Sequence, residues 1–315
     1  MAKVNTVLGE IDSSELGFTL IHEHLRTRSE ALAFQFPRLY DEEHEFQMAY
    51  EQVSAAKARG VKTICDPTVY GLGRDIRFIE KVAVATGVQI VAATGVFTFH
   101  YLPTRFQAED ADYMAEQFVK DIEEGVQNTT IKAGFLKCAT DAQGVTPDVE
   151  KVLRAVARAH HQTGVPIMTH SYPANESGLM QLDIFQEEGV DPKYVLIGHC
   201  GDTDNVDYIV KILERGAYVG LDRYGLTRLI STEKRNEVLL ELVRRGYLNR
   251  IFLSQDYCCT TDRYKPESLK KKIYPKWSMT FLLDEVIPML KQQGLTDEQI
   301  HTIMVENPAN WFSGK

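Results

Sequence analysis

The sequence predicts a single (β/α)8 barrel of the α/β class, and three observations carry this prediction. Short apolar runs rich in β-branched residues recur eight times along the 315 residues, and such runs are typical of buried strands. Most gaps between them contain apolar residues spaced three and four apart, the pattern of a helix that packs by one face. Strands that alternate with helices form a parallel sheet, and eight such units in a chain of this length close into a barrel.

The expected elements follow one another without a break in composition, so residues 1–315 are expected to form one domain. No glycine-rich phosphate-binding turn follows the first strand, which argues against an open nucleotide-binding sheet. The expected strands are Phe18–Ile21, Val61–Cys65, Gln89–Ala93, Ile131–Leu136, Val165–Thr169, Tyr194–Gly198, Ala217–Leu221 and Ile251–Ser254. Helices are expected at Glu43–Arg59, Pro147–His161, Asp204–Arg215 and Glu233–Arg245, and a long loop, residues 257–276, precedes two final helical stretches.

Composition and charge narrow the function classes. Hydrophobic residues make up 44% of the chain and charged residues 25%, which is ordinary for a globular protein. The net charge of −9 argues against nucleic acid and acidic membranes as partners, and a small-molecule substrate is expected instead. No apolar segment is long enough for a membrane span or a secretion signal. The five scattered cysteines fit a reducing, cytoplasmic location.

Histidine and aspartate gather at the carboxyl ends of the expected strands, where barrel enzymes place their active sites. His22 and His24 end the first strand, and residues two apart on a strand point the same way. His170, His199 and Asp256 end the fifth, sixth and eighth strands. One histidine alone could be a core or capping residue. Four histidines at three strand ends, with a carboxylate, predict a metal site.

Lys137 follows the fourth expected strand, and two interpretations remain open for it. It could be a structural lysine that either extends its amine to solvent along a buried stem or forms an ion pair. It could instead be held neutral beside two divalent ions, react with carbon dioxide and bridge both ions as a carbamate. Two neighbouring dications need such an anionic bridge to offset their repulsion.

Motifs along nearly the whole chain resemble one known family. They are residues 17–24 (GFTLIHEH), 66–69 (DPTV), 71–74 (GLGR), 132–134 (KAG), 198–202 (GHCGD), 221–225 (LDRYG) and 306–308 (ENP). In these the sequence resembles the phosphotriesterase-like lactonases of the amidohydrolase superfamily. The resemblance implies a homodimer with two divalent ions per chain, zinc, cobalt, iron or manganese. It implies that His22, His24 and Asp256 hold the more buried ion, that His170 and His199 hold the more exposed ion, and that carboxylated Lys137 bridges them.

The resemblance also gives roles to residues around the metal site. Arg223 resembles the family arginine beside the substrate, where related phosphotriesterases have histidine, and it is expected to be catalytic together with Asp256. A salt-bridged rim arginine is the alternative. Asp202 resembles the acidic residue that supports the site from behind, and a helix N-cap is the alternative. Phe97 and Phe99 stand where lactonases of the family usually have tyrosines, so a phenol that steers the lactone is missing. Gln255 also departs from the family pattern, since histidine is usual there.

The segment after the eighth strand offers an apolar set that could line a channel for an acyl chain. Packing of the loop onto the barrel is the alternative, and it is favoured for Trp277. The residues of this set are Tyr257, Cys258, Tyr264, Leu269, Ile273, Tyr274 and Trp277.

The function expected from these features is hydrolysis of lactones by a hydroxide that bridges two metal ions. Asp256 would accept the proton of the hydroxide and pass it to the departing alkoxide. N-acyl homoserine lactones are the substrates that the resemblance favours, which would make the protein a quorum-quenching enzyme, with organophosphate triesters as a side activity. A dedicated phosphotriesterase is one alternative, which Arg223 argues against. A non-catalytic binding protein on the same fold is another, and it would have lost metal ligands, whereas this sequence has kept them.

Overall fold

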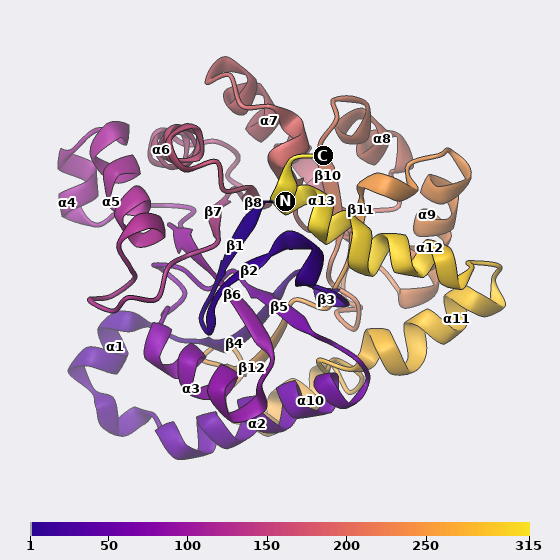
Figure 1. The fold of residues 1–315 in the computed structure, drawn as a ribbon, viewed down its shortest axis with the longest axis horizontal. Coiled ribbons are helices and arrows are strands. Elements are labelled where there is room, and N and C mark those ends of the chain that lie inside the picture. The colour runs from indigo at the N-terminus through magenta and orange to yellow at the C-terminus, as the bar shows by residue number, and fades with distance from the viewer. Residues whose placement is uncertain (1) are drawn as a thin grey trace.

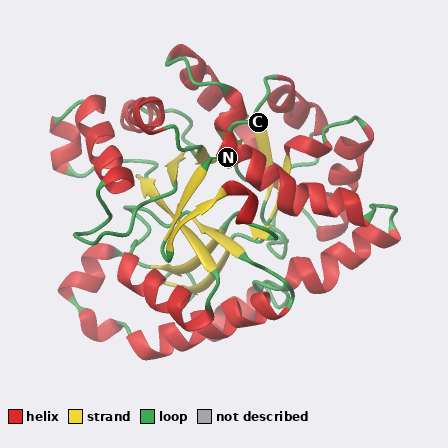
Figure 2. Ribbon diagram, in the orientation of Figure 1, coloured by secondary structure: helices red, strands yellow, loops and turns green. Residues whose placement is uncertain are grey.

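A computed structural model describes residues 2–315 and places eight parallel strands at the centre of a ring of helices (Figures 1 and 2). Each strand pairs with the strand that comes next in this sheet, as the predicted (β/α)8 barrel requires, and the fold class is confirmed. In order, the strands are β3 (Thr19–Leu20), β5 (Thr63–Asp66), β6 (Gln89–Gly95), β7 (Phe135–Ala139), β8 (Ile167–His170), β9 (Val195–Ile197), β10 (Tyr218–Leu221) and β11 (Ile251–Leu253).

Several helices begin where a polar side chain accepts a hydrogen bond from the first helical turn. Asp41, Thr146, Asn205 and Ser231 do this for α2, α6, α8 and α9, the four helices that the sequence predicts. The helices are α1 (Glu30–Gln35), α2 (Glu42–Ala58), α3 (Ile76–Thr86), α4 (Thr104–Ala108), α5 (Ala111–Glu123), α6 (Pro147–Thr163), α7 (Ser177–Glu187), α8 (Val206–Glu214), α9 (Thr232–Arg244), α10 (Glu267–Ile273), α11 (Ile287–Gln292), α12 (Asp297–His301) and α13 (Asn307–Ser313). The π-helical segment Leu282–Val286 leads directly into α11, and Thr302–Glu306 leads from α12 into α13, so the two predicted terminal helical stretches are confirmed.

The barrel strands alternate between two cores, because successive side chains of a strand point to opposite faces. On β7, Leu136 and Cys138 pack outwards against the helices, whereas Phe135 belongs to the core inside the barrel. Lys137 is two residues beyond Phe135 and therefore also points inwards, one layer closer to the carboxyl end. The inner core thus forms a floor under the side chains at the carboxyl ends of the strands. It comprises Val4, Leu16, Ile21, Cys65, Val69, Val91, Ala93, Phe135, Met168, Leu196, Tyr218, Phe252, Trp311 and Phe312.

An N-terminal hairpin, which the sequence did not reveal, lies against the barrel. Its strands β1 (Lys3–Thr6) and β2 (Gly9–Asp12) are antiparallel, and the two termini of the chain lie near each other in Figure 1. The Asn5 side chain donates to the carbonyl of Ala133 at 3.0 Å, and a Cβ on Gly134 would lie 2.6 Å from the Asn5 carbonyl oxygen. The predicted strand Ile131–Leu136 therefore begins too early. Residues 131–134 pass the hairpin, and the strand β7 starts at Phe135.

The barrel is closed between its first and last strands by the buried carboxylate of Glu23. Glu23 lies on β4 (Glu23–Thr27), which pairs in parallel with β12 (Tyr257–Thr261). Its oxygens accept from the Ser254 hydroxyl at 2.7 Å and from the backbone N–H groups of Gln255 and Tyr257 at 2.8 Å. These bonds determine the path of residues 254–257, so the predicted loop 257–276 is wrong over its first part. It begins as a strand and also contains α10.

Two further observations concern the whole described chain. Among residues 2–315 no helix combines the length and the apolar character that a membrane span needs. All five cysteines are free, and four of them are buried.

Replacing Glu23 should destabilise the closure of the barrel. In Glu23→Gln one carboxylate oxygen becomes an amide group, which cannot accept from a backbone N–H and leaves that buried donor without a partner. A cost of about 2 kcal/mol in the free energy of unfolding is expected. Denaturant unfolding measures it, with Glu43→Gln as the control because the Glu43 side chain is exposed. Equal stability of the two variants would show that the Glu23 contacts do not hold the closure.

Candidate metal centre

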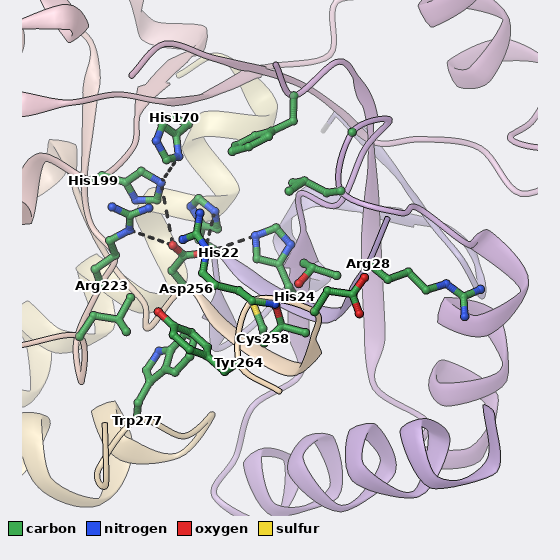
Figure 3. A pocket seen from close by; sticks show the side chains of 18 of the residues that line it. His22, His24, Arg28, His170, His199, Arg223, Asp256, Cys258, Tyr264 and Trp277 are labelled. Atoms are coloured by element: carbon green, nitrogen blue, oxygen red, sulfur yellow. Dashed lines mark hydrogen bonds and ion pairs between the residues drawn. The ribbon is translucent and has the colours of Figure 1, made fainter. Parts of the chain in front are cut away.

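Side chains from the carboxyl ends of the barrel strands converge on one cavity of about 530 Å³ (Figure 3). The inward-pointing positions described above explain this convergence, because each strand ends above the inner core. All the residues that the sequence predicts as metal ligands line this cavity: His22, His24, Lys137, His170, His199 and Asp256.

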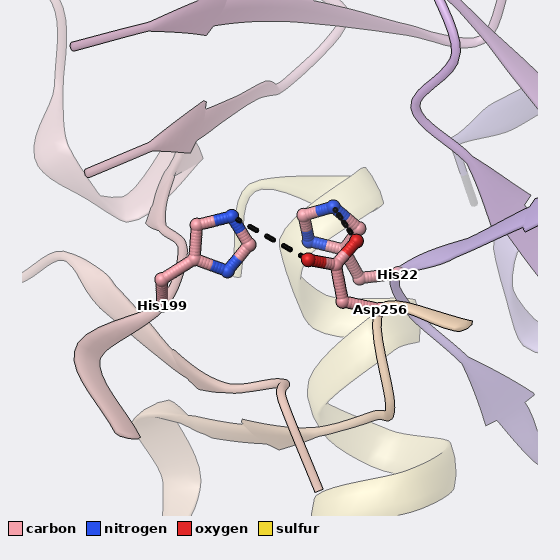
Figure 4. Close-up of side chains that lie close together, drawn as sticks. All are labelled: His22, His199 and Asp256. Atoms are coloured by element: carbon pink, nitrogen blue, oxygen red, sulfur yellow. Dashed lines mark ion pairs between the residues drawn. The ribbon is translucent and has the colours of Figure 1, made fainter. Parts of the chain in front are cut away.

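The Asp256 carboxylate lies among three imidazoles. Its Oδ1 is 3.5 Å from Nε2 of His22 and 3.3 Å from Nε2 of His24, and its Oδ2 is 4.0 Å from Nε2 of His199. One ligand atom each from His22, His199 and Asp256 lie within 4.8 Å of one another, close enough to hold a common ion (Figure 4). His199 and Asp256 have φ of 64° and 49°, a left-handed backbone that is uncommon outside glycine. Such strain is often found at functional sites.

A second group of nitrogen atoms adjoins the first. Nδ1 of His170 lies 2.9 Å from Nε2 of His199, so both atoms face the same small space. The other ring nitrogen of His170 is 3.4 Å from Oδ2 of Asp141. A carboxylate there favours the proton on Nε2, so the Nδ1 lone pair faces His199, and a cation between the two nitrogens would relieve their repulsion. Asp141 is a supporting residue that the sequence analysis did not single out.

Lys137 points into the cavity with an amine that has no partner. Its side chain is 1% exposed, and no described group hydrogen-bonds to its Nζ. Burial lowers the pKa of Lys137 to about 8, although Asp256 and Asp222 oppose the shift. The alternative of an ion-paired structural lysine is therefore wrong for this structure. An unpartnered, partly neutral amine between carboxylates and imidazoles fits a group that bridges metal ions.

Asp222 is the main residue that sequence reasoning missed. Its fully buried carboxylate accepts from Nδ1 of His22 at 2.9 Å and from Nδ1 of His199 at 3.0 Å, and also from the His199 backbone at 2.8 Å. Glycines at the inward positions of two strands make room for it. A Cβ on Gly220 would lie 2.6 Å from Oδ2 of Asp222, and one on Gly198 would lie 3.2 Å from the same atom.

The ionisation of these groups suits metal binding. Burial lowers the pKa of His22 and of His199, and it lowers the pKa of His170 to about 4. Burial alone would raise the pKa of Asp222, but the imidazoles of His199 and His22 outweigh it and hold the pKa well below its usual range. Asp222 is thus an acceptor only, and each Nδ1 that faces it carries a proton. The Nε2 lone pairs of His22 and His199 therefore point at the centre.

Arg223 connects Asp256 to Asp202. Its Nε donates to Oδ2 of Asp256 at 2.9 Å, and Nη1 donates to Oδ2 of Asp202 at 2.8 Å. Arg235 donates to the other Asp202 oxygen at 3.1 Å. The N-cap alternative for Asp202 is wrong, because Asn205 caps α8.

The predicted substrate-binding residues separate into two groups. Phe97, Arg223 and Cys258 line the cavity, and the rings of Phe97 and Phe99 lie 5.3 and 5.2 Å from that of His170. Phe99 itself is not part of the cavity wall, and neither are Tyr257, Leu269 and Ile273. Three of these side chains have other contacts: the Tyr257 hydroxyl accepts from Nζ of Lys270, Leu269 is exposed, and Ile273 packs against the outer core.

Trp277 both packs the loop and lines the cavity. Its indole N–H donates to the Gln255 carbonyl at 2.8 Å, while its ring belongs to the cavity wall. The Gln255 side chain is buried and donates to the Met279 carbonyl at 2.8 Å. Gln255 therefore holds the segment after β12 in place and does not enter the site.

Comparison with known proteins agrees with this geometry. A sequence profile of the Phosphotriesterase family matches residues 2–312. The chain belongs to the phosphotriesterase family. An aryldialkylphosphatase from Saccharolobus solfataricus is 53% identical over 305 residues, which are 96% of this chain and 97% of that protein. A phosphotriesterase homology protein from Mycobacterium tuberculosis is 44% identical over 320 residues, covering 99% and 98% of the two chains.

Solved structures give the same result. The structure of the phosphotriesterase from Mycobacterium tuberculosis matches with a TM-score of 0.95 at 44% identity, over 98% of each chain. As a member of the phosphotriesterase family, the protein is a metal-dependent hydrolase.

Asp222→Asn should weaken metal binding. The amide can accept from only one of the two Nδ1–H groups, so the other imidazole must take the tautomer whose Nε2 carries the proton. A loss of about 10- to 100-fold in metal affinity is expected, the usual effect of removing a group that orients a ligand. Competition with a chelator measures it, and the exposed Asp207→Asn is the control. Unchanged affinity would mean that Asp222 does not orient the ligands.

Proposed function

We propose that the protein is a binuclear metal-dependent lactonase that also hydrolyses organophosphate triesters slowly. The observation that carries the metal part is the unpartnered Nζ of Lys137 in a buried site lined by four imidazoles. In this proposal His22, His24 and Asp256 hold one ion, and His170 and His199 hold the other. Lys137, carboxylated by carbon dioxide, bridges them. Zinc, cobalt, iron and manganese all suit ligands of this kind.

Bound divalent ions lower the pKa of water towards neutrality, which supplies the nucleophile, and they polarise the oxygen of the scissile group. The protein's own residues move the proton. Asp256 accepts it through Oδ1, because Oδ2 is occupied by Arg223, and then donates it to the leaving oxygen. Burial lowers the pKa of Arg223, but the charges of Asp202 and Asp256 raise it by more. Arg223 therefore stays charged and only orients Asp256.

The proton step favours lactones over triesters as the natural substrate. An alkoxide leaves poorly and needs the proton of Asp256, whereas an acidic phenol departs without help. The cavity offers an apolar wall for an acyl chain, formed by Leu72, Phe97, Leu226, Tyr264, Tyr274 and Trp277. N-acyl homoserine lactones combine such a chain with a lactone ring, and their hydrolysis would quench quorum signalling.

A dedicated phosphotriesterase is the second candidate. The name of the Saccharolobus solfataricus relative, an aryldialkylphosphatase, favours it. A lactone panel compared with a phosphotriester on the metal-loaded enzyme separates the two. The proposal expects a higher kcat/KM for at least one acyl homoserine lactone than for the triester. Hydrolysis of the triester alone would overturn it.

We also propose that the protein is a homodimer. The segment around α1 exposes a cluster of apolar side chains, and such a patch on a protein surface marks a site of protein–protein contact. Its members are Leu32, Phe34, Phe36 and Leu39. Light scattering should give twice the chain mass of 35.7 kDa. Phe34→Glu should then shift the protein towards the monomer, whereas Val84→Glu, an exposed apolar position on α3, should not. A monomeric native protein would contradict this proposal.

Asp256→Asn tests the proton step. The variant should lose more activity on lactones than on triesters that have acidic phenol leaving groups, because only the lactones need the donated proton. A selective loss of about 10²-fold is expected, a typical contribution of general acid–base catalysis. Metal content is measured alongside, since loss of an ion would harm both substrates alike. An equal loss with full metal content would refute the shuttle.

Lys137→Ala tests the bridge. The variant should bind fewer than two ions and lose most of its activity, because the mutual repulsion of the ions is no longer offset. Short carboxylic acids should restore part of both, since a small carboxylate can replace the carbamate. Elemental analysis and kinetics measure the two effects. A variant that keeps two ions and full turnover would show that Lys137 is no ligand.

A further inference from the structure

Four arginines line the cavity, and two of them lack a counter-ion. Arg28 pairs with Glu42 at 2.5 Å, and Arg223 pairs with Asp202 and Asp256. Arg228, on the connection between β10 and α9, and Arg263, on the connection between β12 and α10, are both exposed. Within residues 2–315 neither guanidinium makes an ion pair or a hydrogen bond. We call Arg228 and Arg263 the mouth arginines.

The acidic side chains of the same cavity bond to other groups and form no ion pair with the mouth arginines. The Asp262 carboxylate accepts from the Ser29 backbone and from the Tyr40 hydroxyl, both at 2.9 Å. The Glu30 carboxylate accepts from the backbone N–H groups of Gly71 at 2.7 Å and Gly73 at 2.9 Å. The remaining two acids, Asp202 and Asp256, are bound to Arg223 as described above. The mouth arginines are therefore free to meet a ligand.

The positive charge of the mouth arginines contrasts with the negative net charge of the chain. The net charge is −9, so the mean field repels an anion, and arginines beside the cavity that have no ion-pair partner can attract one locally. A guanidinium presents a planar fork of N–H donors that matches the two oxygens of a carboxylate or a phosphate. An oxyanion is thus the ligand group that fits the mouth arginines.

An apolar surface belongs to the same cavity. The rings of Tyr264 and Tyr274 lie 5.9 Å apart, and those of Tyr264 and Trp277 lie 6.2 Å apart. In Figure 3, Tyr264 and Trp277 lie beyond Asp256 as seen from His170. The histidines of this cavity are buried and the mouth arginines are exposed, so a ligand whose reactive group is at the histidines can reach the arginines at its solvent end.

We propose that the preferred substrate carries an oxyanion, a carboxylate or a phosphate, at the end remote from the bond that is hydrolysed. The mouth arginines bind this group, and the aromatic rings contact an apolar spacer between it and the lactone. This inference rests on the proposed lactonase function and narrows its substrate class.

Three lactones with the same acyl chain test the proposal. The chain ends in a carboxylate, in a phosphate monoester, or in a neutral primary amide. One or both anionic lactones should exceed the amide in kcat/KM on the order of 5- to 10-fold, the effect expected of two exposed charge pairs. The preference should fall as salt is added, because exposed charges are screened.

Variants assign the preference to the mouth arginines. The double variant Arg228→Ala with Arg263→Ala should lose it, and the matching double lysine variant should keep part of it. Arg77→Ala with Arg244→Ala is the control, since it removes the same charge from two exposed positions outside this cavity. The control should keep the whole preference.

Two results would overturn the inference. One is equal kcat/KM for the three lactones, and the other is a preference that survives in the double alanine variant or disappears in the control. Failure of the proposed function looks different, because then none of the three lactones, the neutral one included, is hydrolysed.

Discussion

The buried carboxylate of Asp222 is the contact on which the geometry of the site depends. It accepts from Nδ1 of both His22 and His199, and so fixes the orientation of two rings that are far apart in the sequence. Because a carboxylate can only accept, both rings present their Nε2 lone pairs to the same space. Gly220 is needed beneath it, since a Cβ there would lie 2.6 Å from Oδ2 of Asp222. Gly198 is needed beside it, since a Cβ there would lie 2.3 Å from the Thr169 carbonyl oxygen. The space that these two glycines leave is thus as necessary for the site as the side chains that fill it.

The barrel supplies the rest of the arrangement through the period of its strands. Phe135 and Lys137 point the same way on β7, so the floor of the cavity and its central amine belong to one strand face. Glu23 closes the barrel and holds the backbone at Asp256, whose left-handed conformation aims the carboxylate at the histidines. Stability and reactivity are coupled here, because the same hydrogen bonds that join the last strand to the first also position the candidate proton shuttle.

Much of this could be predicted from the sequence. Apolar runs and spacings of three and four residues are local patterns, and they gave the eight strands, the main helices and the residues at the strand ends. Asp222 was missed because its role depends on glycines of two neighbouring strands, which no spacing within one segment reveals. The start of β7 was misplaced because the hairpin β1–β2 occupies its edge, and Tyr257 was misassigned because its strand pairs with β4. Each error concerns a contact between distant segments. A glycine near the end of a strand that is followed two residues later by an aspartate, as Gly220 is by Asp222, is a sequence signal for such a buried carboxylate.

Anomalous diffraction from crystals of the metal-loaded protein tests the central claim most directly, because it locates the ions independently of activity. The account predicts two peaks, one beside His22, His24 and Asp256 and the other beside His170 and His199. It also predicts electron density for a carboxyl group on Nζ of Lys137 between them. A single peak, or two peaks with a free amine on Lys137, would contradict the bridged pair of ions and the role given to the unpartnered amine.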